Sequence, residues 1–346
     1  MKVIFAGGGT GGHLYPAISI AEKLSNKNIE FHFMVSDRGI EANILNKLGY
    51  TYTEQKVSAF MGQKITGKIK ALFNMVKATF KAFSIINKGD KIILTGGFAS
   101  APSAIAGKIL GCEIYLHEQN SVMGLVNRSF AGICNKVFLS FKDTKNAKGN
   151  IVVTGNPVRD IFYKIGSKDD YSGSLLILGG SQGSRKINNI IIESIDLIID
   201  MGFNVFHQTG EKLYDECKNK YGSKLDKYKD KLDVQAYIDD IAWKMRDSDI
   251  IVSRSGAGAV FEIRALNCPA LYIPFAQASE NHQYYNALEV EKFGGCVILE
   301  EKDADKEAFM NKLKDLKENI NTYRSNLKSN QLPVSSDIIL REAGLE

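Results

Sequence analysis

The chain has 346 residues, of which 44% are apolar and 24% charged, and it carries a net charge of +5 at pH 7. This length exceeds what one hydrophobic core usually serves, so we expect about two domains. The composition is that of a globular protein. The weak positive charge is compatible with an anionic substrate or an anionic lipid surface, but it is too small to indicate nucleic-acid binding.

The five cysteines are scattered along the chain and form no Cys-x-x-Cys pair. We therefore expect neither a disulfide framework nor a zinc site, and a reducing cytosol is the simplest environment. A predicted strand begins almost at the N-terminus, and no apolar run reaches the roughly 20 residues of a membrane span. These features predict a protein on the cytoplasmic side of the membrane.

The first half of the chain alternates short apolar runs with helical patterns. Strands are predicted at 3–6, 30–35, 92–95, 113–116, 136–139 and 151–154, with a helix at 17–24. This alternation indicates a parallel sheet with helices on both faces. The polar segment 155–170, which contains Asn156 and Pro157, is predicted to link two domains.

The segment 65–86 combines an apolar stripe at helical spacing with interleaved lysines, and no acidic residue occurs from Gln55 to Lys88. The stripe consists of Ile65, Ile69, Leu72, Phe73, Val76 and Phe80, with Phe83 following. This pattern is typical of a helix that lies in an anionic membrane interface. The alternative is an ordinary amphipathic helix that packs its stripe on the sheet.

The second half repeats the strand–helix alternation of the first. Strands are predicted at 175–178, 203–208, 231–237, 250–254 and 270–273, and helices at 185–201, 305–328 and 335–342. Each half therefore opens with a strand, a glycine-rich loop and a helix.

The two glycine-rich loops, Gly7–His13 and Gly179–Asn188, each follow a short apolar run. Glycine permits tight turns and lets phosphates approach the bare N–H groups at a helix start. Two such openings predict two mononucleotide-type domains facing one cleft. The first loop, together with Asp37, also fits the G-x-G-x-x-G dinucleotide fingerprint, so a nicotinamide or flavin enzyme is an alternative.

Several polar residues on these loops could carry chemistry. His13 stands at the start of the first helix, where it could act as a general base or merely bond a loop carbonyl. Arg159 could clamp a diphosphate or form an inter-domain salt bridge. Ser181 belongs to a second anion cradle, which could also be a purely structural turn.

A third strand–loop–helix opening spans Ser253–Ala265. Glu262 lies one turn into its helix, where a carboxylate can bind a ribose diol or simply compensate the helix dipole. The amides of Asn281–Ala287 could bind sugar hydroxyls, or the segment could be an unrelated polar loop. The pair Asp247 and Asp249 resembles a metal-binding D-x-D motif, but its position directly before a strand favours a loop or cap role.

Seven motifs occur in order along the chain: GGGTGGHLYPA (7–17), TGGFASAPSAIAG (95–107), LHEQN (116–120), GNPVR (155–159), LGGSQGSRKIN (178–188), RSGAGAVFE (254–262) and ENHQYYNA (280–287). Together they resemble the MurG family of GT-B glycosyltransferases. The resemblance spans Val3 to beyond Ala287, and HEQN with GNPVR is specific to the family rather than to the fold.

The resemblance implies a GT-B fold, with two Rossmann-like parallel-sheet α/β domains separated by a deep cleft. Residues 1–158 would form the acceptor and membrane side, and residues 159–331 would bind UDP-GlcNAc. A C-terminal helix within 332–346 would pack back on the first domain.

The activity that the resemblance implies is inverting transfer of GlcNAc from UDP-GlcNAc to the 4-hydroxyl of MurNAc in undecaprenyl-pyrophosphoryl-MurNAc-pentapeptide. This acceptor is lipid I, and the product is lipid II of peptidoglycan synthesis. The protein would be peripheral, on the cytoplasmic face of the cell membrane and in contact with anionic lipids. No cofactor, metal ion or nucleic acid is expected.

The resemblance also implies roles for individual residues. His13 is the favoured general base, and Thr10, Gly11 and Gly12 would line the acceptor diphosphate and donor sugar. The remaining contacts are implied for the donor: Asn120 and Gln283 on GlcNAc, Arg159 and Ser181 on the UDP phosphates, Ile238 on the uracil through its backbone, and Ala257, Gly258, Ala259, Val260, Phe261 and Glu262 on ribose and phosphate. The departures from the family pattern lie beside Gln283, at His282 and Tyr284.

Three other functions remain open at this point. Another GT-B glycosyltransferase or a UDP-GlcNAc 2-epimerase shares the fold but should lack HEQN and GNPVR. An NAD(P)-dependent oxidoreductase would bind NAD(P)H and have no affinity for UDP. A non-catalytic sensor would bind UDP-GlcNAc without transferring the sugar.

Overall fold

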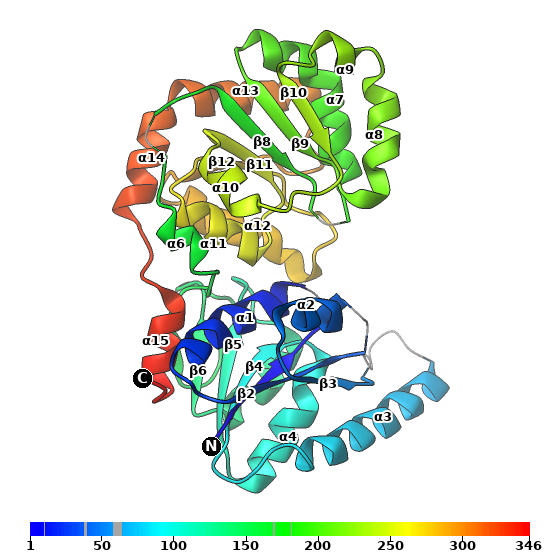
Figure 1. Cartoon of the computed structure of the whole chain (residues 1–346), viewed down its shortest axis with the longest axis vertical. Helices are drawn as coiled ribbons and strands as arrows, with labels where there is room; N and C mark the ends of the chain where they lie inside the picture. The colour runs from blue at the N-terminus through cyan, green and yellow to red at the C-terminus, as the bar shows by residue number, and fades with distance from the viewer. Residues whose placement is uncertain (10, 38–39, 58–63, 169, 181) are drawn as a thin grey trace. The chain divides into compact units, whose positions relative to one another are not determined.

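The computed structural model describes residues 1–9, 11–37, 40–57, 64–168, 170–180 and 182–346. The chain forms two compact units (Figure 1). Unit 1 comprises Met1–Arg159 and Pro333–Glu346, and unit 2 comprises Asp160–Leu332. The sequence placed the two domain boundaries after residues 158 and 331, one residue before the boundaries in the structure, which follow Arg159 and Leu332.

Unit 1 is built on a seven-stranded, wholly parallel sheet in the order β3-β2-β1-β4-β5-β6-β7. Its strands are β1 (Val3–Gly7), β2 (Phe31–Ser36), β3 (Tyr52–Gln55), β4 (Lys91–Gly96), β5 (Glu113–Glu118), β6 (Lys136–Leu139) and β7 (Ile151–Val153). Strands β2 and β3 lie on one side of β1, and the chain then crosses to the other side of β1, where β4 to β7 follow in order. Loops diverge at such a switch point, which is where ligands bind in open α/β sheets.

The helices of unit 1 are α1 (Gly11–Asn26), α2 (Ile40–Leu48), α3 (Ile65–Phe83), α4 (Ala101–Leu110), α5 (Leu125–Phe130) and α15 (Ser335–Glu342). The C-terminal helix α15 packs beside α1, and Ile339 and Leu340 join Leu14 and Ile18 in one buried cluster. Lys136 bonds Glu342 at 2.9 Å. The last residues of the chain are thus part of the core of unit 1.

Helix α3 lies at the periphery of unit 1, beside α4 (Figure 1). It buries the small face formed by Ala71, Ala78 and Ala82 with Met75. The six large apolar residues of its opposite face, Ile65, Ile69, Leu72, Phe73, Val76 and Phe80, are 47% to 76% exposed. The alternative in which this stripe packs on the sheet is therefore wrong: alanines make the contact, and the bulky side chains face outward.

Unit 2 has a six-stranded parallel sheet in the order β10-β9-β8-β11-β12-β13. Its strands are β8 (Ser174–Leu178), β9 (Asn204–Gln208), β10 (Leu232–Gln235), β11 (Ile250–Ser253), β12 (Ala270–Tyr272) and β13 (Cys296–Ile298). The winding reverses between β8 and β11, so unit 2 has its own switch point. Together the two sheets confirm the predicted class of two Rossmann-like parallel-sheet α/β domains.

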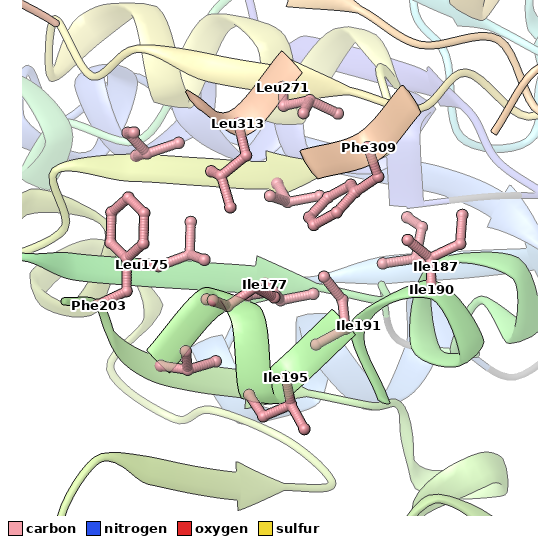
Figure 2. Packing of buried hydrophobic residues seen from close by; sticks show 14 of the residues in the cluster. Leu175, Ile177, Ile187, Ile190, Ile191, Ile195, Phe203, Leu271, Phe309 and Leu313 are labelled. Carbon is pink, nitrogen blue, oxygen red and sulfur yellow. The ribbon is translucent and has the colours of Figure 1, made fainter. Parts of the chain in front are cut away.

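The helices of unit 2 are α6 (Ile161–Lys164), α7 (Arg185–Asp200), α8 (Tyr214–Tyr221), α9 (Lys224–Lys227), α10 (Ile241–Arg246), α11 (Ala257–Ala265), α12 (His282–Glu291), α13 (Lys306–Glu318) and α14 (Ile320–Ser329). Isoleucines of α7 meet β8 and residues of α13 in one dry cluster (Figure 2). This is the usual burial of an amphipathic helix on a sheet, in contrast to α3.

Two sequence predictions need correction. The helix predicted at 305–328 is two helices, because Asn319 leaves helical geometry and its side chain bonds the carbonyl and carboxylate of Asp315. The sequence also missed the short strands β3 and β13. Strand β3 is polar and lies at the sheet edge, and β13 has only three residues, so neither shows a clear pattern.

Candidate functional site

Glycines line the switch point of unit 1, where β1 and β4 end side by side. The Gly8 amide donates to the Gly96 carbonyl at 3.3 Å. Gly97 has φ +75°, and a Cβ there would collide with the Gly8 carbonyl oxygen. The two loops can approach this closely only because both lack side chains.

His13 lies in the first turn of α1, half-buried at this switch point. Its Nδ1 is 2.8 Å from the Thr95 carbonyl oxygen and 3.3 Å from Oε1 of Gln119. Gly96 has φ +98°, and a Cβ there would come within 3.0 Å of His13 Nδ1. The glycine therefore makes room for the ring.

The HEQN motif occupies the end of β5, and three of its four side chains are buried. Glu118 accepts hydrogen bonds from the Asn120 amide at 3.0 Å, the Gly124 amide at 2.9 Å and the Asn127 side chain at 2.7 Å. Asn120, the residue predicted to bind the sugar, is half-buried and is held in place by Glu118. The main role of the buried side chains of this motif is therefore to hold the Asn120 side chain in position.

Glu41 is a residue that sequence reasoning missed. It lies on α2, it is almost fully buried, and its Oε1 accepts from the Gly9 amide and from the Ser36 hydroxyl. Its second oxygen, Oε2, is buried and has no hydrogen-bond partner in the described part of the chain. No local pattern marks this residue, because the contact joins positions 32 residues apart.

The glycine loop of unit 2 follows β8 and leads into α7. The Gly183 amide closes a turn onto the Gly180 carbonyl at 3.0 Å, and both glycines have positive φ. A Cβ at Gly183 would lie 2.8 Å from Leu213 Cδ1 and would also crowd the Thr209 carbonyl, whereas a Cβ at Gly180 would meet nothing within 4 Å. One side of the loop is thus packed and the other has open space, as an anion site requires.

The start of α11, on the other side of the same switch point, is similarly open. A Cβ at Gly256 or at Gly258 would meet nothing within 4 Å, and the first turn of α11 carries no acidic residue. Val260 and Phe261 are core side chains, so this pair can offer a ligand only backbone groups. Glu262 is half-buried one turn into the helix.

Two further predicted donor contacts also belong to unit 2. Oε1 of the Gln283 side chain accepts a hydrogen bond from the Phe275 amide at 3.0 Å. Because this contact fixes the orientation of the side-chain amide, Nε2 is the atom that can donate to a ligand. Ile238 follows β10 in an irregular segment, and its backbone N–H donates to no backbone carbonyl of the described residues. Such a backbone is suited to pair with the polar edge of a base.

Other predicted residues divide into three groups. Thr10 and Ser181 lie outside the described residues. Gly11 and Gly12 begin α1, directly before His13. Arg159 is the last residue of unit 1 and is half-buried.

The D-x-D pair serves the structure of unit 2. Asp249 is fully buried and binds the Ser172 and Ser174 amides and Arg324, with Lys168 at 3.2 Å. Burial raises the pKa of this carboxyl, but the two amides and two cations outweigh it, so the net shift is downward. Asp249 is committed to these partners, which is a structural role of the loop or cap kind that the sequence predicted.

Comparison with known families supports the two-domain assignment. Residues 3–139 match the glycosyltransferase family 28 N-terminal domain, and residues 174–339 match the glycosyltransferase family 28 C-terminal domain. The crystal structure of MurG from Acinetobacter baumannii aligns with a TM-score of 0.78 at 23% identity, covering 100% of this chain and 99% of that one. The predicted GT-B fold is confirmed by this likeness.

Closer relatives carry a common name, UDP-N-acetylglucosamine–N-acetylmuramyl-(pentapeptide) pyrophosphoryl-undecaprenol N-acetylglucosamine transferase. The protein of that name from Dichelobacter nodosus is 34% identical, over 87% of this chain and 85% of its own length. The one from Alkaliphilus oremlandii is 33% identical, over 94% and 92%. These matches favour the glycosyltransferase prediction over the oxidoreductase and epimerase alternatives. The chain belongs to the MurG family of glycosyltransferases.

Proposed function

We propose that this protein transfers GlcNAc from UDP-GlcNAc to the 4-hydroxyl of MurNAc in lipid I, with inversion at the anomeric carbon, to give lipid II. The observation that carries the proposal is the placement of His13 at the switch point of unit 1 in a chain of this family. Relatives of the stated name match this chain over nearly their whole length, which supports the same substrates here.

Most of the proposed donor contacts belong to unit 2, and two, from Asn120 and Arg159, belong to unit 1. The open N-terminus of α11 and the glycine loop before α7 offer backbone N–H groups and helix dipoles to the UDP diphosphate. Ser181 and Arg159 would add contacts to the same phosphates. Glu262 would bind the ribose diol, and the backbone of Ile238 would pair with uracil. Gln283 Nε2 would donate to a GlcNAc hydroxyl, with Asn120 as the second sugar contact.

The acceptor is assigned to unit 1, where His13 would act as the general base. Inverting transfer is a single displacement: the 4-oxygen bonds to C1 of GlcNAc as the bond from C1 to the UDP oxygen breaks. The hydroxyl proton passes to His13, and the bonding electron pair leaves with UDP. Gly11 and Gly12, at the positive end of α1, would hold the acceptor diphosphate together with Thr10. The leaving charge is stabilised by helix N-termini and Arg159, so this scheme needs no metal ion or other cofactor.

Membrane contact is assigned to α3. Its exposed stripe and the exposed lysines Lys64, Lys68, Lys70, Lys77 and Lys81 belong to a segment that contains no acidic residue. Each buried apolar side chain contributes about 1.5–3 kcal/mol, and each lysine near an anionic surface about 1 kcal/mol. No helix in the described part of the chain is long and apolar enough to cross a bilayer. We therefore propose a peripheral protein on the cytoplasmic face of the membrane, where a polyprenyl-linked acceptor is accessible.

The direct test is to incubate the protein with labelled UDP-GlcNAc and a lipid I analogue in anionic vesicles. The proposal predicts a GlcNAc-β-1,4-MurNAc product, with the linkage read by NMR. Hydrolysis of UDP-GlcNAc without disaccharide, or an α linkage, would refute the assigned reaction.

A further inference from the structure

A chain of buried polar groups runs behind His13, away from the surface on which a substrate would act. His117 and Gln119, both buried in the HEQN motif, connect it to the carbonyl of Gly155. The steps are His117 Nε2 to Gly155 O at 3.3 Å, Gln119 Nε2 to His117 Nδ1 at 3.2 Å, and His13 Nδ1 to Gln119 Oε1 at 3.3 Å. The proposed reaction gives none of these groups except His13 a role.

The direction of every hydrogen bond in this chain is determined at its ends. The Gly155 carbonyl can only accept, and the Ser140 hydroxyl, also 3.3 Å from Nε2, donates its one proton to the Glu118 carbonyl at 2.9 Å. His117 therefore carries its proton on Nε2 and presents a lone pair at Nδ1. Burial lowers the pKa of His117 to about 4, with the Gly155 carbonyl acting in the opposite direction, so the ring is neutral near pH 7. Gln119 must then point its Nε2 toward His117, where it also donates to the Thr95 carbonyl at 2.8 Å.

The orientation of the Gln119 side chain determines which of its two polar atoms lies beside His13 Nδ1. With Nε2 directed at His117, the amide oxygen faces His13 Nδ1, beside the Thr95 carbonyl oxygen. Two acceptors surround Nδ1, so Nδ1 carries the proton and Nε2 keeps the lone pair. A flipped Gln119 would place its oxygen against the Thr95 carbonyl oxygen and its N–H groups against His13.

We infer that His117 and Gln119 are positioning residues that, together with the Thr95 carbonyl, hold His13 in the Nδ1–H tautomer, so that Nε2 is the base that receives the acceptor proton. This inference rests on the proposed function. When Nε2 takes the proton, His13 becomes an imidazolium, and the Nδ1–H bonds to Gln119 and Thr95 strengthen because their donor is now charged. The HEQN motif would then have two positioning roles: Glu118 orients Asn120, and His117 and Gln119 orient His13.

The wild-type protein alone provides the first test. Long-range ¹H–¹⁵N correlation NMR on ¹⁵N-histidine-labelled full chain reports which ring nitrogen of each histidine carries the proton, with His13→Gln used to assign the signal. We expect His13 to show the Nδ1–H tautomer near neutral pH, although an unconstrained histidine favours Nε2–H. An Nε2–H tautomer of His13 would overturn the inference, without any variant and independently of activity.

The second test removes the amide of Gln119. Gln119→Met keeps the side-chain length and loses both polar atoms. The Thr95 carbonyl, 2.8 Å from Nδ1, remains as an acceptor, so we expect His13 to keep the Nδ1–H tautomer. The kcat should fall by about 10- to 100-fold, the effect of losing one hydrogen bond to the imidazolium that forms in the reaction. The KM for UDP-GlcNAc should stay unchanged. Tyr221→Phe is the matched control: it removes a buried hydroxyl 2.8 Å from His207 in unit 2, and it should change neither His13 nor kcat.

The outcomes separate the inference from the function. A wild-type chain that forms the disaccharide but shows Nε2–H at His13 rejects the positioning role and keeps the function. A chain that forms no disaccharide rejects the role in transfer, whatever the tautomer. Equal losses of kcat in Gln119→Met and Tyr221→Phe would also contradict the inference, since any buried polar deletion would then suffice.

Discussion

The glycine-rich openings of the two units differ in what already contacts them. In unit 1 the Gly9 amide bonds the buried carboxylate of Glu41, and a histidine with a fixed hydrogen-bond environment follows four residues later. In unit 2 the first turns of α7 and α11 carry no acidic residue. A Cβ at Gly180, Gly256 or Gly258 would meet no atom of the described residues within 4 Å, as is also true of Gly9, so the carboxylate contact rather than open space separates the two openings.

This difference teaches that similar loops need not bind similar ligands. Open amides at a helix start suit a diphosphate that gains charge as it leaves. A loop that already contacts a carboxylate is a poorer anion site, but it places a base within reach of a hydroxyl. The similarity of the two openings in sequence therefore hides a division of labour, with the donor bound in unit 2 and the acceptor activated in unit 1.

The largest expected effect comes from His13→Ala. Loss of a general base lowers kcat by about 100- to 10,000-fold, whereas the Kd for UDP should be unchanged because the UDP contacts belong mainly to unit 2. Transfer rates with a lipid I analogue and calorimetric titration with UDP measure the two quantities. His32→Ala, at the far end of unit 1's sheet, is the control. A kcat within threefold of wild type would assign the base elsewhere.

The second-largest effect is expected at α3, a helix of unit 1. Ile69→Glu combined with Phe73→Glu should weaken binding to anionic vesicles by about 100-fold or more, since two apolar side chains become charged. The melting temperature should stay unchanged because both positions are exposed. Leu197→Glu, an exposed apolar position on α7, is the matched control. Equal vesicle binding by all three proteins would show that α3 is not the membrane-contacting surface.

Gly258→Asp tests the anion site of unit 2. The position has space for a side chain, and a carboxylate in the first turn of α11 stabilises the helix while it repels a diphosphate. We expect UDP affinity to fall by about 10-fold, equivalent to roughly 1.4 kcal/mol, with an equal or higher melting temperature. Gly258→Asn has the same shape without the charge and should lose much less affinity. Equal losses in the two variants would indicate a steric effect instead.

The smallest effect is expected from Glu41→Gln. The amide oxygen can still accept from the Gly9 amide and the Ser36 hydroxyl, but the negative charge beside the first loop is gone. We expect the KM for the lipid I analogue to fall by about two- to fivefold, a typical effect of one charge near a helix N-terminus, with the KM for UDP-GlcNAc unchanged. A higher acceptor KM would mean that the carboxylate itself helps to bind the acceptor.

Much of the fold could be predicted from the sequence, because long alternating patterns determine it. The strands after which the glycine loops stand are fully buried apolar runs, and the structure has them where they were expected. The prediction of one helix at 305–328 was wrong, because Asn319 ends the first of two helices there through a side-chain contact with Asp315. Periodicity alone does not report such a break.

The site was predictable where a motif carries it and not where folding assembles it. His13 and Gly258 could be singled out as candidates because their loops follow strands. Glu41 and the hydrogen-bond roles of His117 and Gln119 were missed, because they depend on contacts with residues far away in the sequence. For α3, the sequence showed the stripe but not its direction, since only packing reveals that the alanine face is the buried one.

The division of labour between the units can be measured most directly by hydrogen–deuterium exchange with and without UDP. We predict that UDP slows exchange at the amides around Gly183 and at the start of α11 in unit 2, while exchange at Gly8, Gly9 and His13 in unit 1 stays the same. Equal protection of the unit 1 loop by UDP would contradict this account, because both glycine loops would then bind the nucleotide.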